Sequence, residues 1–191
     1  MANGKVLRDN DFDMRGKLAG PSDRGNANRL TPGDRRLACT AMELREFFSE
    51  EAVQLELQGN SKDEILKELI GLLKLDEKSE GMLFKMLKRR ENLGSTGIGR
   101  GIAIPHCRSL VVNRLRVAFG RKKDGVDFKA IDDKPVNFFF LIVAPPLEVS
   151  NQYLPVLGKI AQFSKESDVP GRLLEISSPA DFMALLEEKR V

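Results

Sequence analysis

The stretch PVNFFFLIVAPP, residues 135–146, restricts the possible folds of this chain more than any other segment. Its large apolar side chains do not alternate with polar ones, so both faces of the segment must be covered. The apolar run from Phe138 to Pro146 is far shorter than the roughly 20 residues that a membrane-spanning helix needs. We therefore predict a central strand of a sheet and no direct insertion into a membrane.

Two helices are predicted in the first half of the chain. Ser61 and Glu64 form a capping box, and apolar residues follow them at helical spacing. A second amphipathic helix is expected to start at Ser79 and to end at Gly94, a residue type that commonly ends helices. The short stretch before these helices, residues 52–57, alternates in the manner of a strand.

The second half of the chain adds another strand and two more helices. Residues 114–122 alternate as a strand, and residues 151–163 have a helical pattern in which Pro155 should lie in the first turn. Ser178 and Pro179 are suited to the N-cap and first position of a last helix. This interleaving of helices and strands predicts an α/β domain with a mixed sheet and helices on both of its faces.

The N-terminal 40 residues differ in composition from the rest. They are rich in Gly, Asn, Asp and Arg and lack periodic apolar positions. We expect residues 1–41 to be a disordered extension, or a non-native leader if the biological chain starts at Met42, and residues 42–191 to be one domain. Residues 1–40 carry eight basic and five acidic side chains, which leaves 23 of each in 41–191. A domain without a basic excess gives no support for nucleic-acid binding.

The compartment is predicted from the cysteines and from the start of the chain. Cys39 and Cys107 are too few for a disulfide framework. The N-terminus has no apolar signal core. Both features favour the reducing cytoplasm.

The only histidine, His106, follows the glycine-rich stretch GSTGIGRGIAIP, whose end is expected to form a short strand that Pro105 stops. The stretch lacks the Lys and Ser/Thr of a P-loop and the third glycine of a dinucleotide fingerprint. One histidine and two distant cysteines do not make a zinc site, so neither a metal nor a cofactor is expected. Neighbours on a strand point to opposite faces, which argues against a dyad of His106 with Cys107.

The residues around this histidine suit an anion. Glycines let backbone N–H groups approach closely, and Ser95 and Thr96 add hydroxyl donors. Arg90 lies near the end of the preceding helix, where its guanidinium could reach the same place. Together these groups suit a phosphoryl group on the imidazole of His106. The alternative is a structural histidine that only hydrogen-bonds to the backbone.

The stretch RRENLGSTGIGRGIAIPH, residues 89–106, resembles the signature of enzyme IIA domains of the bacterial phosphotransferase system, in the fructose, mannitol and nitrogen-regulatory class. The similarity continues through FKAIDDKPVNFFFLIVAP, residues 128–145, and extends over residues 42–190. The nitrogen-regulatory members are the most similar. The resemblance implies a three-layer α/β/α sandwich and a phosphotransferase that forms a phosphohistidine at His106.

The same resemblance implies the partners. The phosphoryl group would come from the phosphocarrier protein HPr or its nitrogen-branch relative. It would then pass to a IIB domain in sugar transport, or its presence would control binding to regulatory targets. Onward transfer and a purely regulatory binding module both remain open, because phosphorylation by itself changes the charge of a partner surface. A degenerate domain that is never phosphorylated is a third reading, against which the retained His106 and Arg90 argue.

By resemblance, Arg90 matches the active-site arginine of the family, and Glu91 matches a residue that either serves the site or orders the helix end. The chain departs from the family at Tyr153, where a second active-site histidine is usual. A tyrosine can donate a hydrogen bond to a phosphoryl oxygen but cannot become a cation, and packing is its alternative role. The candidate site is therefore His106, Arg90, Ser95, Thr96 and Tyr153.

Overall fold

The computed structural model describes residues 43–147 and 151–190 of the chain. The extension predicted over residues 1–41 lies outside the described residues, as does Met42. The elements follow one another in this order: the 3₁₀ helices η1 (Leu44–Phe47) and η2 (Glu50–Ala52), β1 (Val53–Gln54), α1 (Lys62–Gly71), α2 (Glu77–Asn92), β2 (Gly97–Gly99), β3 (Ile102–Ala103), β4 (His106–Arg108), β5 (Arg116–Val126), β6 (Val136–Ala144), α3 (Tyr153–Phe163), α4 (Val169–Glu175) and α5 (Pro179–Lys189). Among the described helices, none has the length and apolar character needed to span a membrane.

Strand β6 lies in the interior of a mixed six-stranded sheet, as predicted from its apolar sequence. The strand order is β1-β5-β6-β3-β2, and β4 also pairs with β6. The pair β5–β6 is antiparallel, whereas β3 and β4 both run parallel to β6. Every residue of β6 except Asn137 is buried. The strand therefore organises most of the sheet around itself.

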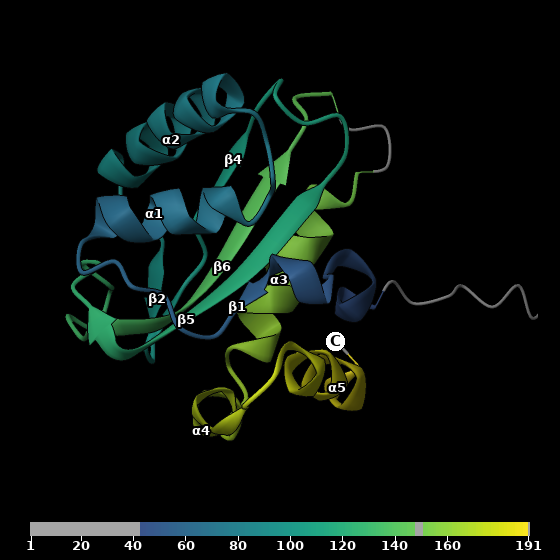
Figure 1. The fold of residues 1–191 in the computed structure, drawn as a ribbon. Helices are drawn as coiled ribbons and strands as arrows, with labels where there is room; N and C mark the ends of the chain where they lie inside the picture. The colour runs from purple at the N-terminus through teal and green to yellow at the C-terminus, as the bar shows by residue number, and fades with distance from the viewer. Residues whose placement is uncertain (1–42, 148–150, 191) are drawn as a thin grey trace, which may run out of the picture. The chain divides into compact units, whose positions relative to one another are not determined.

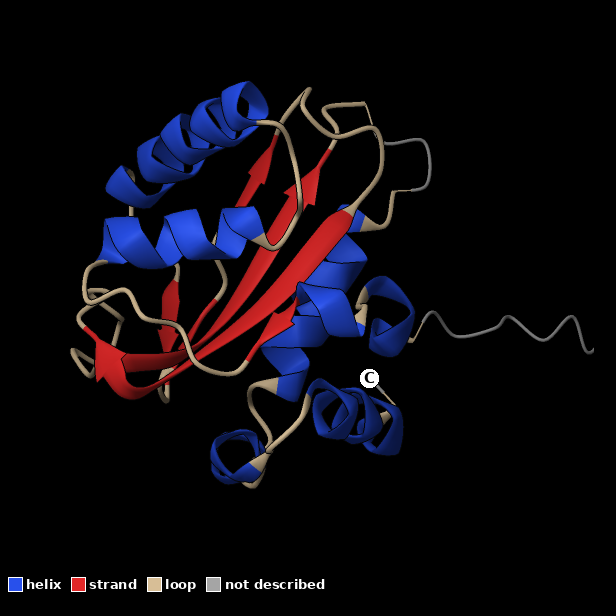
Figure 2. Ribbon diagram, viewed as in Figure 1, coloured by secondary structure: helices blue, strands red, loops and turns tan. Residues whose placement is uncertain are grey.

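Alternate residues of β6 enter two separate hydrophobic cores. Phe138, Phe140 and Ile142 pack with residues of α3, α4 and α5. Phe139 and Leu141 pack on the opposite face with residues of α1 and α2. Figures 1 and 2 show the sheet between these two groups of helices. The predicted three-layer α/β/α sandwich with a mixed sheet is thus confirmed.

The strand predicted over residues 52–57 is shorter than expected. Only Val53–Gln54 pairs as β1, although the Leu57 N–H still donates to the Arg121 carbonyl at 2.9 Å. Beyond β1, the Leu55 carbonyl accepts from the Nε of the Arg121 side chain at 3.0 Å.

Helix α4 is an element that sequence periodicity did not indicate. The guanidinium of Arg121 lies at its C-terminal end, where it donates to the carbonyls of Leu173, Leu174 and Ile176 at 2.6–3.0 Å. Carbonyls at a helix end lack partners within the helix, so this buried arginine supplies them. A charged residue in β5 is therefore buried because it caps a helix that is far away in sequence.

The helix termini follow their local chemistry. The capping box of Ser61 is present, and Ser178 likewise caps α5, with Pro179 as its first residue. Pro155 lies in the first turn of α3, as predicted. Helix α2, however, begins at Glu77 rather than Ser79, because the carboxylate of Asp76 accepts both the N–H and the hydroxyl proton of Ser79.

Strand β3 ends at Ala103, before Pro105, as predicted, but a further strand that the sequence did not indicate begins at His106. Proline has no N–H to donate, so the ladder is interrupted there. The Pro105 carbonyl still accepts from the Ile142 N–H at 2.9 Å, and β4 resumes at His106 beside the same strand β6. The imidazole is therefore carried by a strand that pairs directly with β6.

Substitution of Phe140 tests how much the stability of the fold depends on β6. It is fully buried among the rings of Phe48, Phe119, Phe163 and Phe182. We expect Phe140→Ala to lower the free energy of unfolding by about 3–5 kcal/mol, because the change leaves a cavity in a packed core. Denaturant unfolding measures this loss.

The matched control is Ile131→Ala, since that side chain is 78% exposed and should change stability by less than about 0.5 kcal/mol. Similar losses in the two variants would contradict the central place given to β6.

Candidate functional site

The imidazole of His106 is held by one hydrogen bond to the backbone. Its Nδ1 lies 2.7 Å from the Ile104 carbonyl oxygen. A carbonyl can only accept, so Nδ1 carries the proton and Nε2 carries the lone pair. The backbone bond expected of a structural histidine is thus present, and it also leaves a lone pair on Nε2.

The surroundings of His106 lower the pKa of its imidazole. Burial is the largest cause, because it disfavours the charged ring, and the positive charge of Arg90 acts in the same direction. The Ile104 carbonyl and the carboxylate of Glu91 oppose this shift without reversing it. The lowered pKa therefore favours the neutral ring at pH 7.

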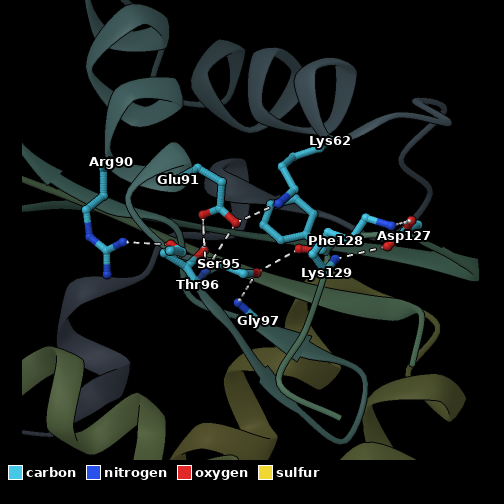
Figure 3. Close-up of polar contacts among 10 residues, drawn as sticks. Lys62, Arg90, Glu91, Ser95, Thr96, Gly97, Asp127, Phe128 and Lys129 are labelled. Carbon is cyan, nitrogen blue, oxygen red and sulfur yellow. Dashed lines mark hydrogen bonds and ion pairs between the residues drawn. The ribbon is translucent and has the colours of Figure 1, made fainter. Parts of the chain in front are cut away.

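Arg90 extends from the last turn of α2 toward the glycine-rich loop (Figure 3). Its Nη1 donates to the Gly94 carbonyl at 2.9 Å, and its charge acts on the imidazole. The side chain is half-buried, whereas that of the preceding Arg89 is exposed. Of the two neighbouring arginines, Arg90 is therefore the one that faces the site.

The glycines between Gly97 and Gly101 meet the needs of a tight turn and of close packing. Gly97 and Gly99 belong to β2, which pairs antiparallel with β3 as a hairpin. Gly99 and Gly101 have φ angles of +86° and +75°, in the region that favours glycine. A Cβ on Gly97 would lie 2.7 Å from the Cβ of Ala130. Close packing and turn geometry thus account for these positions.

The hydroxyl groups of Ser95 and Thr96 are engaged within the protein. Ser95 Oγ donates to the Phe128 carbonyl at 2.7 Å and accepts from the Gly97 N–H at 3.1 Å. Thr96 is buried, and its Oγ1 donates to Glu91 Oε2 at 2.7 Å. These protons hold the loop in place (Figure 3). Their predicted role toward phosphoryl oxygens stays a prediction that requires both bonds to break.

Glu91 orders the loop that follows α2. Its buried carboxylate accepts the Thr96 N–H at 3.1 and 3.2 Å as well as the Thr96 hydroxyl. Lys62, from the first turn of α1, forms an ion pair with the same carboxylate at 2.9 Å. Sequence reasoning missed Lys62, because it lies 29 residues away and no motif joins it to Glu91.

Tyr153 lies beside His106, as its alignment with the family predicted. The centroids of the two rings are 6.3 Å apart, and Tyr153 is buried in the core on the α3 face of the sheet. The Arg108 guanidinium lies 4.6 Å from the centre of the tyrosine ring and donates to the carbonyls of Pro145 and Pro146. Arg108 thus links Tyr153 to the end of β6, a contact that the sequence did not suggest.

Cys107 points away from this site. Its side chain lies in the core formed with α1 and α2, opposite to the face that holds Tyr153. Burial raises the pKa of the thiol to about 12, so it is protonated and unreactive at neutral pH. Within the described part of the chain, no three His, Cys, Asp or Glu side chains gather as a metal site would require.

Comparisons with known proteins agree with this geometry. The family model of the phosphoenolpyruvate-dependent sugar phosphotransferase system, EIIA 2, matches residues 46–189. A fructose-specific EIIABC component of Bacillus subtilis is 31% identical over 139 residues, which are 72% of this chain and 22% of that protein. The chain therefore spans less than a quarter of the length of that relative.

Two nitrogen regulatory proteins match over most of their own length. One from Bradyrhizobium diazoefficiens is 32% identical over 133 residues, which are 69% of this chain and 86% of that protein. The crystal structure of nitrogen regulatory protein IIA-Ntr from Neisseria meningitidis has a TM-score of 0.68 and 32% identity, and the match covers 75% of this chain and 98% of that one. The segment matched by the family model contains Arg90, His106 and Tyr153. The chain thus belongs to the EIIA 2 family of the phosphoenolpyruvate-dependent sugar phosphotransferase system.

Proposed function

We propose that this protein is a phosphoryl carrier that accepts a phosphoryl group on Nε2 of His106 from an HPr-like phosphocarrier protein. Membership of the EIIA 2 family supports a phosphotransferase. The observation that carries the residue assignment is the 2.7 Å contact of Nδ1 with the Ile104 carbonyl. It places the proton on Nδ1 and leaves the lone pair on Nε2 for attack on phosphorus.

The step is an exchange between two imidazoles. The Nε2–P bond forms as the bond between phosphorus and the donor's histidine nitrogen breaks, and the donor imidazole leaves with its electron pair. The ring of His106 becomes positively charged, and the Ile104 carbonyl stabilises it through the Nδ1 proton. Negative charge on the three equatorial oxygens is the other feature that needs stabilisation. Arg90 supplies a guanidinium for it.

Exposed leucines support a protein as the phosphoryl donor. Leu110 and Leu147 are 86% and 90% exposed and lie just beyond β4 and β6, which pair in parallel through Arg108 and Ala144. Leu154 is 67% exposed and follows Tyr153, the neighbour of His106. Strands β4 and β6 end side by side, and apolar side chains exposed together at a surface are typical of protein interfaces. These three leucines are therefore the surface that we assign to the phosphocarrier.

Two fates of the phosphoryl group are consistent with the relatives. The name of the EIIABC relative joins an A part with B and C parts, which supports onward transfer to a IIB domain. The nitrogen regulatory relative, matched over 86% of its length, supports control of a regulatory target instead. A chase of the phosphorylated protein with a IIB domain separates them, because only onward transfer moves the label.

The assignment of His106 predicts a single labelled site. Incubation with enzyme I, HPr and labelled phosphoenolpyruvate should place one acid-labile and alkali-stable phosphoryl group on the wild-type protein. The label should be absent from His106→Ala, because no other imidazole exists in the chain. Label that survives in this variant would refute the assignment, and no label on the wild type would favour the degenerate domain.

Arg90 should matter to the rate and Arg89 should not. Arg90→Ala removes a charge that acts at the imidazole, and we expect phosphoryl transfer to slow about tenfold or more. Arg89→Ala is the matched control, because Arg89 is the adjacent residue and its side chain is exposed. Rapid-quench transfer assays compare the two, with unfolding midpoints as a check on the fold. Equal rates would contradict the role of Arg90.

Substitutions of Tyr153 distinguish a role of its hydroxyl in phosphoryl transfer from a role of its ring in packing. If its hydroxyl binds the phosphoryl group, Tyr153→Phe should slow transfer several-fold, since one neutral hydrogen bond contributes about 1 kcal/mol. Tyr153→His restores the histidine that is usual in the family and should match or exceed the wild-type rate. Wild-type kinetics in the Phe variant, measured in the same assay, would show that only the ring matters.

A further inference from the structure

A continuous path of polar contacts runs from the first turn of α1 to the imidazole of His106. Lys62 Nζ pairs with Glu91 at 2.9 Å, and Glu91 accepts from the N–H and the hydroxyl of Thr96. The Thr96 carbonyl accepts from the Ile104 N–H at 3.0 Å. The Ile104 carbonyl in turn accepts from Nδ1 of His106.

The same lysine also reaches the other side of the loop. Its Nζ lies 4.5 Å from the centre of the Phe128 ring, a distance at which a cation is attracted to an aromatic face. The Phe128 carbonyl accepts from the Ser95 hydroxyl. Lys62 therefore contacts side chains of the two residues, Glu91 and Phe128, that bind Thr96 and Ser95 (Figure 3).

Charge explains why a lysine is needed at this place. Glu91 is only 6% exposed, and a buried carboxylate is costly unless it is paired and hydrogen-bonded. Lys62 is the cation that pairs with it, while the nearby Asp127 is bound by Lys129 at 2.7 Å. Without Lys62, Glu91 would lose its paired cation, and its negative charge would be opposed at the imidazole by Arg90 alone.

We propose that Lys62 is a positioning residue of the phosphoryl-transfer site, which fixes the Ser95–Thr96 loop and balances the charge of Glu91 beside His106. This inference rests on the proposed function for its effect on transfer. Its effect on the imidazole does not, because the titration of His106 is measured without any partner protein.

The single histidine makes the test direct, since one pair of imidazole signals in the NMR spectrum reports the site. Among the described residues, the charged groups that act on the ring are Arg90 and Glu91 from α2, and Arg108 lies against the neighbouring ring of Tyr153. We expect Lys62→Met to raise the pKa of His106, because Glu91 keeps its charge while its counter-charge is lost. Glu91→Gln should lower the pKa of His106, and Lys62→Arg should leave it near the wild-type value.

The matched control is Lys67→Met. Lys67 also lies on α1 and also has its Nζ over a phenylalanine ring, 5.2 Å from the centre of Phe84, but it has no part in the path. The control should titrate like the wild type. Phosphoryl acceptance should slow several-fold in Lys62→Met, in kcat more than in KM, and recover in Lys62→Arg.

Coincident titration curves for Lys62→Met and Lys67→Met, or equal transfer rates in the two variants, would overturn the proposal. A protein that takes no label at all would overturn the proposed function instead, while the pKa changes would still decide the link between Lys62 and His106. A loss of stability common to both lysine variants does not move the pKa, so the titration separates positioning from general destabilisation.

Discussion

The arrangement of this protein depends on one strand that is covered on both faces. Strand β6 cannot lie at an edge or face water, because nearly all its side chains are apolar and buried. Two layers of helices must therefore cover it, and neighbouring strands must pair along both of its edges. The residues at its carboxyl end pair with β4, which places His106 at a fixed position in the sandwich.

The site is assembled from different layers of the sandwich around that position. Arg90 and Glu91 come from α2 on one side of the sheet, and Tyr153 comes from α3 on the other. His106 lies in the sheet between them, with its ring toward Tyr153. Because helices and strands of the sandwich hold these groups, the fold itself sets the positions of the His106 imidazole and the Arg90 guanidinium.

Polar residues near the histidine divide into two kinds. Arg90 is half-buried and acts on the imidazole through its charge. The residues of the second kind are bonded to one another or to backbone groups and comprise Lys62, Glu91, Ser95 and Thr96. These residues hold the loop whose Thr96 carbonyl accepts from the Ile104 N–H. The hydroxyls that were expected to bind the phosphoryl group thus maintain the loop in this structure. The glycines between them likewise satisfy a tight hairpin.

Features that depend on neighbours along the chain could be predicted from the amino-acid sequence. The caps at Ser61 and Ser178 follow from interactions within a few residues, so their patterns predict them. The burial of β6 was predictable for another reason, because its own unbroken apolar sequence requires cover on both faces. The motif that ends at His106 indicated the family through residue identity. The partners of Lys62, Arg108 and Arg121 were decided only by the tertiary structure. These contacts join groups tens of residues apart, and no periodicity encodes which buried carboxylate, ring or carbonyl a long charged side chain will reach once the layers have packed.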